Sequence, residues 1–522
     1  MDNQNLENIY SGLSSGDSEP KNEYSKYDTL TAILLIPLAY FLVRAANVSE
    51  FPLGRLLLSV LLFILAGFYL KKHNVRLTEN KFAFGCAVFA MVLSLGLIIT
   101  SNEAVQALIA FITGAAYLYF VFAAPGNSAE RYPSSLFPLE MLKAAVIMPF
   151  GSIGCAFEAI SSTRKSQKIG KNILFILMGL AIAFIPALIV FALLSYDSSF
   201  KELSNKILDL GDFDIFSFAS DLMFTVPLVL LSFGALYSSK CRRFADILTA
   251  EKCERVSKTV RFAPIAMVCA AVAPFIFIYS VFFASQLDYY LSAFSGVLPD
   301  GLSYADYARN GFFELCTVSA INALMILCTS VFCRPDKNDK PHTALKIANT
   351  LISFLTLILI ATAISKMVLY IDTYGLTEKR VLSSAFMIFL AVMFLALIIK
   401  QFAKKTNVII TAIIAAVIIT SLLAFSNISG VIASYNTDRY LSGELENFEP
   451  ENLLELGDSG IIHLDRIARE APEKSIREKA KKLLISEALG REDDESIFSI
   501  TIPSLRADSV LDKYRNKSLL GM

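Results

Sequence analysis

Two ionisable residues interrupt apolar stretches long enough to cross a membrane, and they are the first candidates for chemistry in this chain. Glu314 lies about one turn into the stretch 312–333, and Lys366 lies about one turn before the end of the stretch 347–371. A charge held within a bilayer costs free energy, so such residues commonly mark ion pairs or functional sites. We predict an ion pair between Glu314 and Lys366. Two structural alternatives remain open: a simple clamp, or a lysine that extends its ammonium to the interface.

Further polar residues and glycines flank this pair along the chain. They are Tyr307, Arg309 and Gly311 near Glu314, and Asp372, Tyr374, Gly375 and Arg380 after Lys366. An α-helix rises 1.5 Å per residue, so both charges lie at a similar depth if the two stretches are antiparallel neighbours. We therefore expect one charge cluster near the membrane surface, with Arg309, Asp372 and Arg380 above the pair.

Patterns typical of catalysis are largely absent from the sequence. Its three histidines, His73, His342 and His463, are widely separated, which argues against a histidine-based metal site. There is no phosphate-binding loop, no dinucleotide-binding glycine pattern after a strand, and no GxSxG elbow. The basic segment 242–261 is better suited to anionic lipid than to nucleic acid. We expect no enzymatic activity, no metal, no cofactor and no nucleic-acid partner.

The segments that must position these residues are predicted membrane helices. Hydrophobic residues make up 55% of 522 residues and charged residues only 18%, more apolar surface than one soluble core could bury. Apolar runs of about 20 residues match the thickness of a bilayer, in which each span must satisfy its own backbone. The predicted spans are 30–46, 52–70, 82–100, 104–124, 172–195, 220–238, 262–285, 312–333, 347–371, 383–400 and 406–426. The fold class is therefore all-α: a polytopic helical membrane bundle with about 11 transmembrane helices.

The loops between these spans predict how the chain is oriented. Alternate loops contain 26 lysines and arginines against 5 in the others. Positively charged loops remain in the cytoplasm, so the N-terminus is predicted inside and, after an odd number of crossings, the C-terminus outside. The eight cysteines fall in spans or cytoplasmic loops, and we expect reduced thiols.

One apolar segment near 139–160 is too short to cross and contains Pro149, Gly151 and Gly154. We interpret it as a re-entrant or interfacial element on the cytoplasmic side. The predicted domain organisation is a disordered cytoplasmic N-terminus (1–28), an N-terminal transmembrane region of six spans (29–260), a C-terminal transmembrane region of five spans (261–426) and an extracytoplasmic helical domain (427–522).

The C-terminal segment 427–522 has a soluble composition, with 18 acidic and 13 basic residues. Apolar residues three and four apart in 450–490 predict two consecutive amphipathic helices that form an antiparallel pair. Such a pair buries little apolar surface alone. We therefore expect it to pack on external loops or on a protein partner, as an interaction module rather than an inert tail.

Several segments carry a resemblance to a known family. Residues 302–315 (LSYADYARNGFFEL) and 369–380 (LYIDTYGLTEKR) resemble hallmark segments of domain-of-unknown-function family 4173, which is related to family 4153. VFFAS (281–285), IASYNTDRY (432–440) and, more weakly, SITIPSLRADSVLDKYR (499–515) are also similar. The resemblance covers roughly 260–515, and the first half of the chain matches only in its hydropathy. The family often has arginine where this chain has Lys366, a change that keeps the charge but alters its geometry.

The resemblance implies a multi-pass protein of the bacterial cytoplasmic membrane with no established activity. Two functions follow from the residues themselves. The first is an envelope sensor, scaffold or assembly protein that uses the external helical domain and the outer charge cluster. The second is a transporter of a small solute or lipid-linked substrate, favoured by the prolines inside spans (Pro37, Pro186, Pro227 and Pro274) that can mark broken helices.

Overall fold

The computed structural model describes residues 24–47, 51–130, 132–162, 215–285, 304–336, 338, 340–403, 405–445, 448–491 and 500–519, with single positions at 190, 194 and 197. Within these residues the chain is helical apart from turns, loops and one isolated bridge between Ala263 and Cys333. The predicted all-α fold class is confirmed.

Ten of the described helical segments are long and apolar enough to cross a membrane. They are formed by α2 (Lys26–Asn47), α3 (Pro52–Lys72), α4 (Lys81–Leu93) with α5 (Gly96–Ile99), α6 (Glu103–Ala123), α12 (Ile215–Cys241), α14 (Ile265–Ser285), α16 (Tyr304–Phe332), α17 (Thr343–Tyr374), α18 (Glu378–Phe402) and α19 (Val408–Phe425). They correspond to ten of the predicted spans; the remaining prediction, 172–195, lies outside the described residues except for the single positions 190 and 194. A short 3-10 helix (Ala245–Ile247) and α13 (Ala250–Val260) connect α12 to α14.

Asparagine side chains define where three of these helices begin. The Oδ1 atoms of Asn80, Asn102 and Asn407 accept hydrogen bonds from backbone N–H groups in the first turns of α4, α6 and α19. These caps satisfy donors that have no partner within the helix. The N-terminal boundary prediction needs correction, because α2 begins at Lys26 and so includes residues 26–28, which we had expected to be disordered.

The short apolar segment folds into a bent helical element. It comprises α7 (Phe137–Leu142), a π-helix η1 (Lys143–Ile147), α8 (Met148–Phe150) and α9 (Cys155–Ser162). The two halves are bent by 48° at a break, a shape shared by broken spans and re-entrant loops. The re-entrant or interfacial interpretation therefore stays a prediction.

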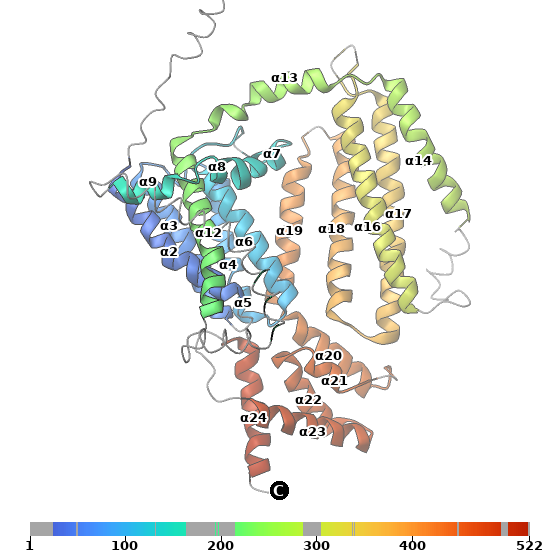
Figure 1. Ribbon diagram of the computed structural model, residues 1–522. Coiled ribbons are helices and arrows are strands. Elements are labelled where there is room, and N and C mark those ends of the chain that lie inside the picture. The colour runs from blue at the N-terminus through green and yellow to red at the C-terminus, as the bar shows by residue number, and fades with distance from the viewer. Residues whose placement is uncertain are drawn as a thin grey trace, which may run out of the picture. The chain divides into compact units, whose positions relative to one another are not determined.

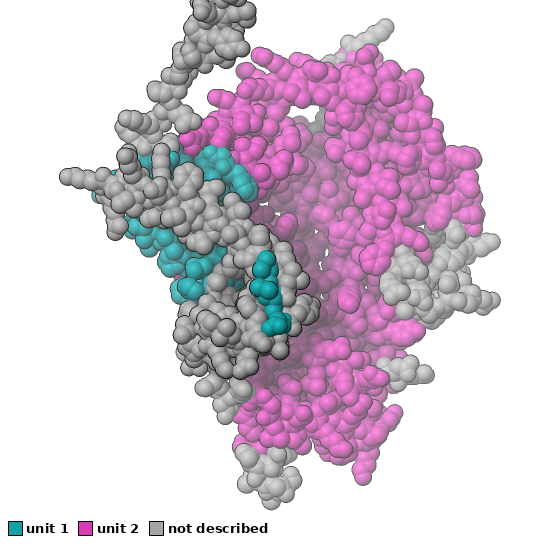
Figure 2. Space-filling model, viewed as in Figure 1, with its two compact units in different colours: residues 1–43, 65–75, 148–241 teal, residues 44–64, 76–147, 242–522 magenta. Residues whose placement is uncertain are grey.

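The chain divides into two compact units that interleave along the sequence (Figure 2). Unit 1 contains residues 1–43, 65–75 and 148–241, and unit 2 contains residues 44–64, 76–147 and 242–522. Residue 260, the predicted limit between two successive transmembrane regions, is not a boundary between these units. The physical reason lies in unit 1, where α12 packs against α8 and α9 and its Lys240 reaches Asp28 on α2.

Unit 2 combines membrane helices with a C-terminal group of helices. In Figure 1, α14, α16, α17 and α18 lie side by side, and α20 (Ile428–Leu441), α21 (Glu451–Leu454), α22 (Asp458–Glu470), α23 (Lys474–Gly490) and α24 (Ile502–Leu519) gather beyond one end of α18 and α19. The two helices predicted within 450–490 are present as α22 and α23, and the short α21 precedes them. One hydrophobic core joins both groups: Val105 and Ile109 of α6 belong to the same buried cluster as Leu464 of α22 and Val510 of α24.

Candidate functional site

Glu314 and Lys366 line one cavity of about 310 Å³ between α14, α16 and α17. Its other walls are mainly apolar and include Ile278, Phe282 and Leu359. The Glu314 side chain is exposed, Lys366 is half-buried, and the two charges interact electrostatically. The structure therefore brings together the two charged residues that were singled out in the sequence. They are one acidic and one basic residue in the lining of a mainly apolar cavity.

Hydrogen bonds between polar side chains hold the helices that form this cavity. The Tyr279 hydroxyl on α14 donates to Asn322 Oδ1 on α16 at 2.6 Å, and Asn322 Nδ2 donates to Thr356 Oγ1 on α17 at 2.8 Å. About two turns further along, Thr329 Oγ1 donates to Asn349 Oδ1 at 2.9 Å. In an apolar medium such bonds fix the register of neighbouring helices. These residues were not predicted from the sequence, although Asn322 and Asn349 are visible as polar positions inside apolar runs.

The other predicted members of the cluster do not join this cavity. Tyr307, Arg309 and Gly311 lie in the first turns of α16, and their side chains lie outside the described part of the structure. Asp372, Tyr374, Gly375 and Arg380 lie at the turn between α17 and α18. The expected single cluster is therefore divided, among the described residues, into a cavity and a separate turn.

Arg380 stabilises the C-terminal end of α17. Its guanidinium carbon lies 3.8 Å from the centroid of the Tyr370 ring, and Nη1 donates to the carbonyl oxygen of Tyr374 at 3.0 Å and to that of Gly375. A cation at this position satisfies helix carbonyls that have no intrahelical partner and complements the helix dipole. Arg380 is thus occupied by its own turn.

Asn436 of α20 attaches this turn to the C-terminal helices. Its Oδ1 accepts from the backbone N–H of Leu376 at 2.7 Å, and its Nδ2 donates to the Leu376 carbonyl at 2.9 Å. Gly375 adopts a φ of +77°, and a Cβ atom there would meet Asn436 Oδ1 at 2.5 Å. Glycine is therefore required both by the backbone conformation and by the close approach of Asn436.

Two further contacts strengthen the attachment of this turn to α20. Arg439 Nη1 lies 3.8 Å from Asp372 Oδ1, and Ser429 Oγ donates to Glu378 Oε1 at 3.1 Å. Asp372 therefore pairs with α20, rather than lying above Glu314 and Lys366 as predicted. The segments 369–380 and 432–440, which carried the family resemblance separately, form one structural junction.

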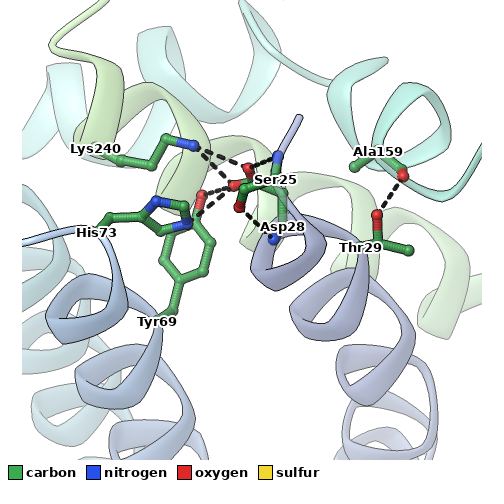
Figure 3. Close-up of polar contacts among 7 residues, drawn as sticks. All are labelled: Ser25, Asp28, Thr29, Tyr69, His73, Ala159 and Lys240. Carbon is green, nitrogen blue, oxygen red and sulfur yellow. Dashed lines mark hydrogen bonds and ion pairs between the residues drawn. The ribbon is translucent and has the colours of Figure 1, made fainter. Parts of the chain in front are cut away.

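A second polar site, not predicted from the sequence, lies in unit 1 (Figure 3). The Asp28 carboxylate is fully buried and accepts hydrogen bonds from Lys240 Nζ at 2.8 and 3.0 Å, from the Tyr69 hydroxyl at 2.6 Å and from the Ser25 backbone N–H at 2.7 Å. His73 Nε2 lies 3.3 Å from Asp28 Oδ1. The site thus joins α2, α3 and α12 through one carboxylate.

The His73 imidazole is the group in this site that can change charge near neutral pH. Burial and the nearby Lys240 ammonium lower the pKa of His73 below its ordinary value, and Asp28 acts in the opposite direction. The site therefore holds a buried ion pair beside a neutral histidine. A possible signal was available in the sequence: Asp28, His73 and Lys240 all lie near span ends on the predicted cytoplasmic side.

The arrangement of these sites favours ion pairing and helix docking. No three His, Cys, Asp or Glu side chains come together as a metal-binding group within the part of the chain that the structure describes. Residues 87–467 match the model of the domain of unknown function DUF4153. The chain belongs to the DUF4153 family.

The DUF4153 match corrects the extent of the resemblance. It begins at residue 87, so the expectation that the first half of the chain matches only in hydropathy is wrong. The match is to DUF4153 and includes the cavity between α14, α16 and α17, the α17–α18 turn and α20. It ends before 499–515, the segment with the weakest resemblance. Neither a curated protein nor a solved structure matches the chain.

Proposed function

We propose that this DUF4153 protein is an envelope sensor, scaffold or assembly protein of the bacterial cytoplasmic membrane. Its C-terminal helices would lie on the extracytoplasmic side, as the distribution of lysine and arginine indicates, and would bind a protein partner there. The observation that carries the proposal is the pair of hydrogen bonds between Asn436 and the backbone of Leu376. They give the C-terminal helices a direct mechanical connection to the α17–α18 turn.

The exposed face of α23 is the surface we assign to the partner. Lys482, Ser486 and Leu489 are exposed and lie at helical spacing on one face, and Leu489 retains 57% of its accessible surface. The opposite face of α23 contributes Ala480, Leu484 and Ala488 to the core that the C-terminal helices share with the membrane helices. A partner on the outer face would therefore act on a helix that packs against α22 and α24, and α24 in turn contacts α5 of the membrane helices.

Photo-cross-linking in living cells tests this proposal. A photoreactive residue at position 482 or 486 is expected to capture one discrete protein, and the capture should weaken in an Asn436→Ala background. The same residue at Phe111, which is 74% exposed on a membrane helix, serves as the control for lipid-facing positions. If positions 482, 486 and 489 give only the diffuse pattern of position 111, the partner surface is not on α23.

Transport of a small solute or lipid-linked substrate is the alternative, and the cavity containing Glu314 and Lys366 favours it. The cavity lies within helices long enough to span, and one of them, α14, contains Pro274. Alternating access requires the site to open toward each side of the membrane in turn. A cysteine at Val318, which lines the cavity, can report this in a chain whose eight native cysteines are replaced by serine. Labelling by impermeant reagents from both faces favours transport, and labelling from one face favours the scaffold.

A further inference from the structure

A second cavity, of about 370 Å³, lies where α19 passes into α20 and where α22 and α24 meet. Its lining includes Asn427, Gly430, Ser434, His463 and Arg506. None of the residues that line it is acidic. This cavity is separate from the one that contains Glu314 and Lys366, and it involves the segment 499–515, which neither the family match nor the proposed function uses.

Two basic side chains of this cavity have unused hydrogen-bonding capacity in the described structure. Arg506 is exposed, and its five N–H donors can bind an oxyanion in bidentate fashion. His463 Nδ1 is buried and has no hydrogen-bond partner. Burial and the nearby Arg466 lower the pKa of His463 below its ordinary value, with Asp438 acting in the opposite direction. A neutral imidazole still provides one N–H donor.

Asn427 adds an amide whose position is fixed by the backbone. It adopts a left-handed φ of +45°, and its Oδ1 accepts from the Ser459 hydroxyl at 3.0 Å. A Cβ atom on Gly430 would meet Asn427 Nδ2 at 2.7 Å, so glycine leaves room for this amide beside the cavity. With its oxygen occupied by Ser459, Asn427 has its two N–H donors left for a ligand.

Asp438, a carboxylate that contacts the lining residue Ser434, is neutralised by other groups. Asp438 pairs with Arg466 and also accepts from the Ser434 hydroxyl at 3.3 Å. The cavity therefore combines a guanidinium, an imidazole and an amide as donors, without an acidic residue in its lining. Donors of this kind are suited to a phosphate group.

The position of the cavity is suited to a ligand at a membrane surface. Ser426, which lines it, directly follows α19, an 18-residue apolar helix that is about 27 Å long, close to the thickness of the hydrocarbon core. Ile502 of α24 and Val431 of α20 also line the cavity and are 43% and 50% exposed. Apolar side chains thus border a group of polar donors at the level expected for lipid headgroups.

We infer that this cavity binds a phosphate group, carried either by a phospholipid headgroup or by a free phosphate. Arg506 and His463 are the principal ligands, and Asn427 supplies a further donor. The inference goes beyond the proposed scaffold function, because it concerns a ligand rather than a protein partner. It can hold or fail independently, since binding is measured on the purified chain.

Thermal unfolding of the full-length protein in a phosphate-free detergent tests this inference. The probes are inorganic phosphate, dioctanoyl phosphatidic acid and dioctanoylglycerol, which matches the second probe without its phosphate. At least one phosphate-containing probe is expected to raise the unfolding midpoint saturably, because a ligand stabilises the state that it binds. Dioctanoylglycerol is expected to have no such effect. Saturation by inorganic phosphate alone identifies a free anion as the ligand, and a response restricted to phosphatidic acid identifies a lipid headgroup.

Arg506→Met is expected to raise the dissociation constant of the phosphate-containing probe about tenfold or more. This is the scale of one lost charge-assisted interaction. Lys513→Met is the matched control, because it removes one positive charge from an exposed position on the same helix, outside the cavity lining. His463→Gln should also weaken binding and provides a second variant if Arg506→Met unfolds. The inference is overturned if neither phosphate probe binds, or if the Arg506 and Lys513 variants bind equally.

Discussion

Asn436 and Leu376, 60 residues apart in the chain, are joined by two hydrogen bonds through both ends of one side-chain amide. The backbone groups of a turn normally require water or a neighbouring element as partners. Here a single asparagine of α20 satisfies both the N–H and the carbonyl group of Leu376. These two hydrogen bonds attach the α17–α18 turn directly to α20, the first of the C-terminal helices.

Asn436→Ala should lower the free energy of unfolding by about 1–3 kcal/mol, because two backbone groups lose their partner. The free energy of unfolding of Asn436→Asp should lie between those of Asn436→Ala and the parent, because a carboxylate can accept from the Leu376 N–H but cannot donate to the Leu376 carbonyl. Chemical or thermal unfolding in detergent measures the difference. Asn452→Ala, an exposed asparagine in α21, is the control, and an equal effect of the two alanine variants contradicts the prediction.

Glu314 and Lys366 should be energetically coupled. A charge at the bilayer centre costs about 2.5–3.5 kcal/mol on insertion scales and less near the interface, so loss of one partner leaves the other in a poorly solvated cavity. Glu314→Gln and Lys366→Met should each lower the unfolding midpoint. The double variant should be less damaged than the sum of the two, by roughly 0.5 kcal/mol or more. Strictly additive losses would mean that the two charges do not stabilise each other.

Asp28→Asn should be among the more destabilising single substitutions in the chain. It leaves the Lys240 ammonium without its carboxylate in a mostly buried site, and breaking such a pair costs about 3–5 kcal/mol. Glu254→Gln is the matched control, since the Glu254–Lys258 pair is 68–71% exposed and should contribute at most about 1 kcal/mol. Unfolding measurements that rank the two variants alike would show that the Asp28 site is solvated.

Stability should fall as the pH decreases below about 6.5, the ordinary pKa of histidine. The pKa values of His73 and His463 are lowered in the folded protein, so the unfolded chain binds protons more readily in this range. The contribution of each histidine is therefore complete above its unfolded pKa and is lost as the pH falls toward its folded pKa. His73→Gln and His463→Gln should each reduce the dependence of the unfolding midpoint on pH, measured between pH 7 and pH 5. If neither variant, nor the two combined, changes the slope of the unfolding midpoint against pH, these histidines are not the source of the pH dependence.

Residue 250 should lie in the cytoplasm and residue 480 outside it, because the basic loops fall on one side of the predicted spans. Reporter fusions at these positions, or labelling of introduced cysteines in intact cells, measure the two locations directly. Reagent access to position 250 from outside would reverse the orientation and with it the extracytoplasmic assignment of the C-terminal helices.

The sequence allows prediction of features that depend on the bilayer, and far less of those that depend on helix arrangement. A membrane span must be apolar, and its backbone N–H and C=O groups must form hydrogen bonds within the span. The ten described spans were therefore recognisable from composition alone. Glu314 and Lys366 were identifiable because charges in such spans are rare. The Asp28 site was not, because hydropathy does not reveal that α2, α3 and α12 meet. The contact between Asn436 and Leu376 likewise depends on how α20 docks, which no local pattern encodes.

The core shared by Val105, Ile109, Leu464 and Val510 has a consequence for biosynthesis. Residues that enter the membrane early wait for partners that are synthesised about four hundred positions later. Until α24 has left the ribosome, α5, which α24 contacts in the folded protein, lacks part of its native cover, and a chaperone or neighbouring lipid must occupy that surface. Premature termination at any point before α24 would thus leave a protein that is inserted but incomplete, and a quality-control protease could recognise it by that uncovered surface.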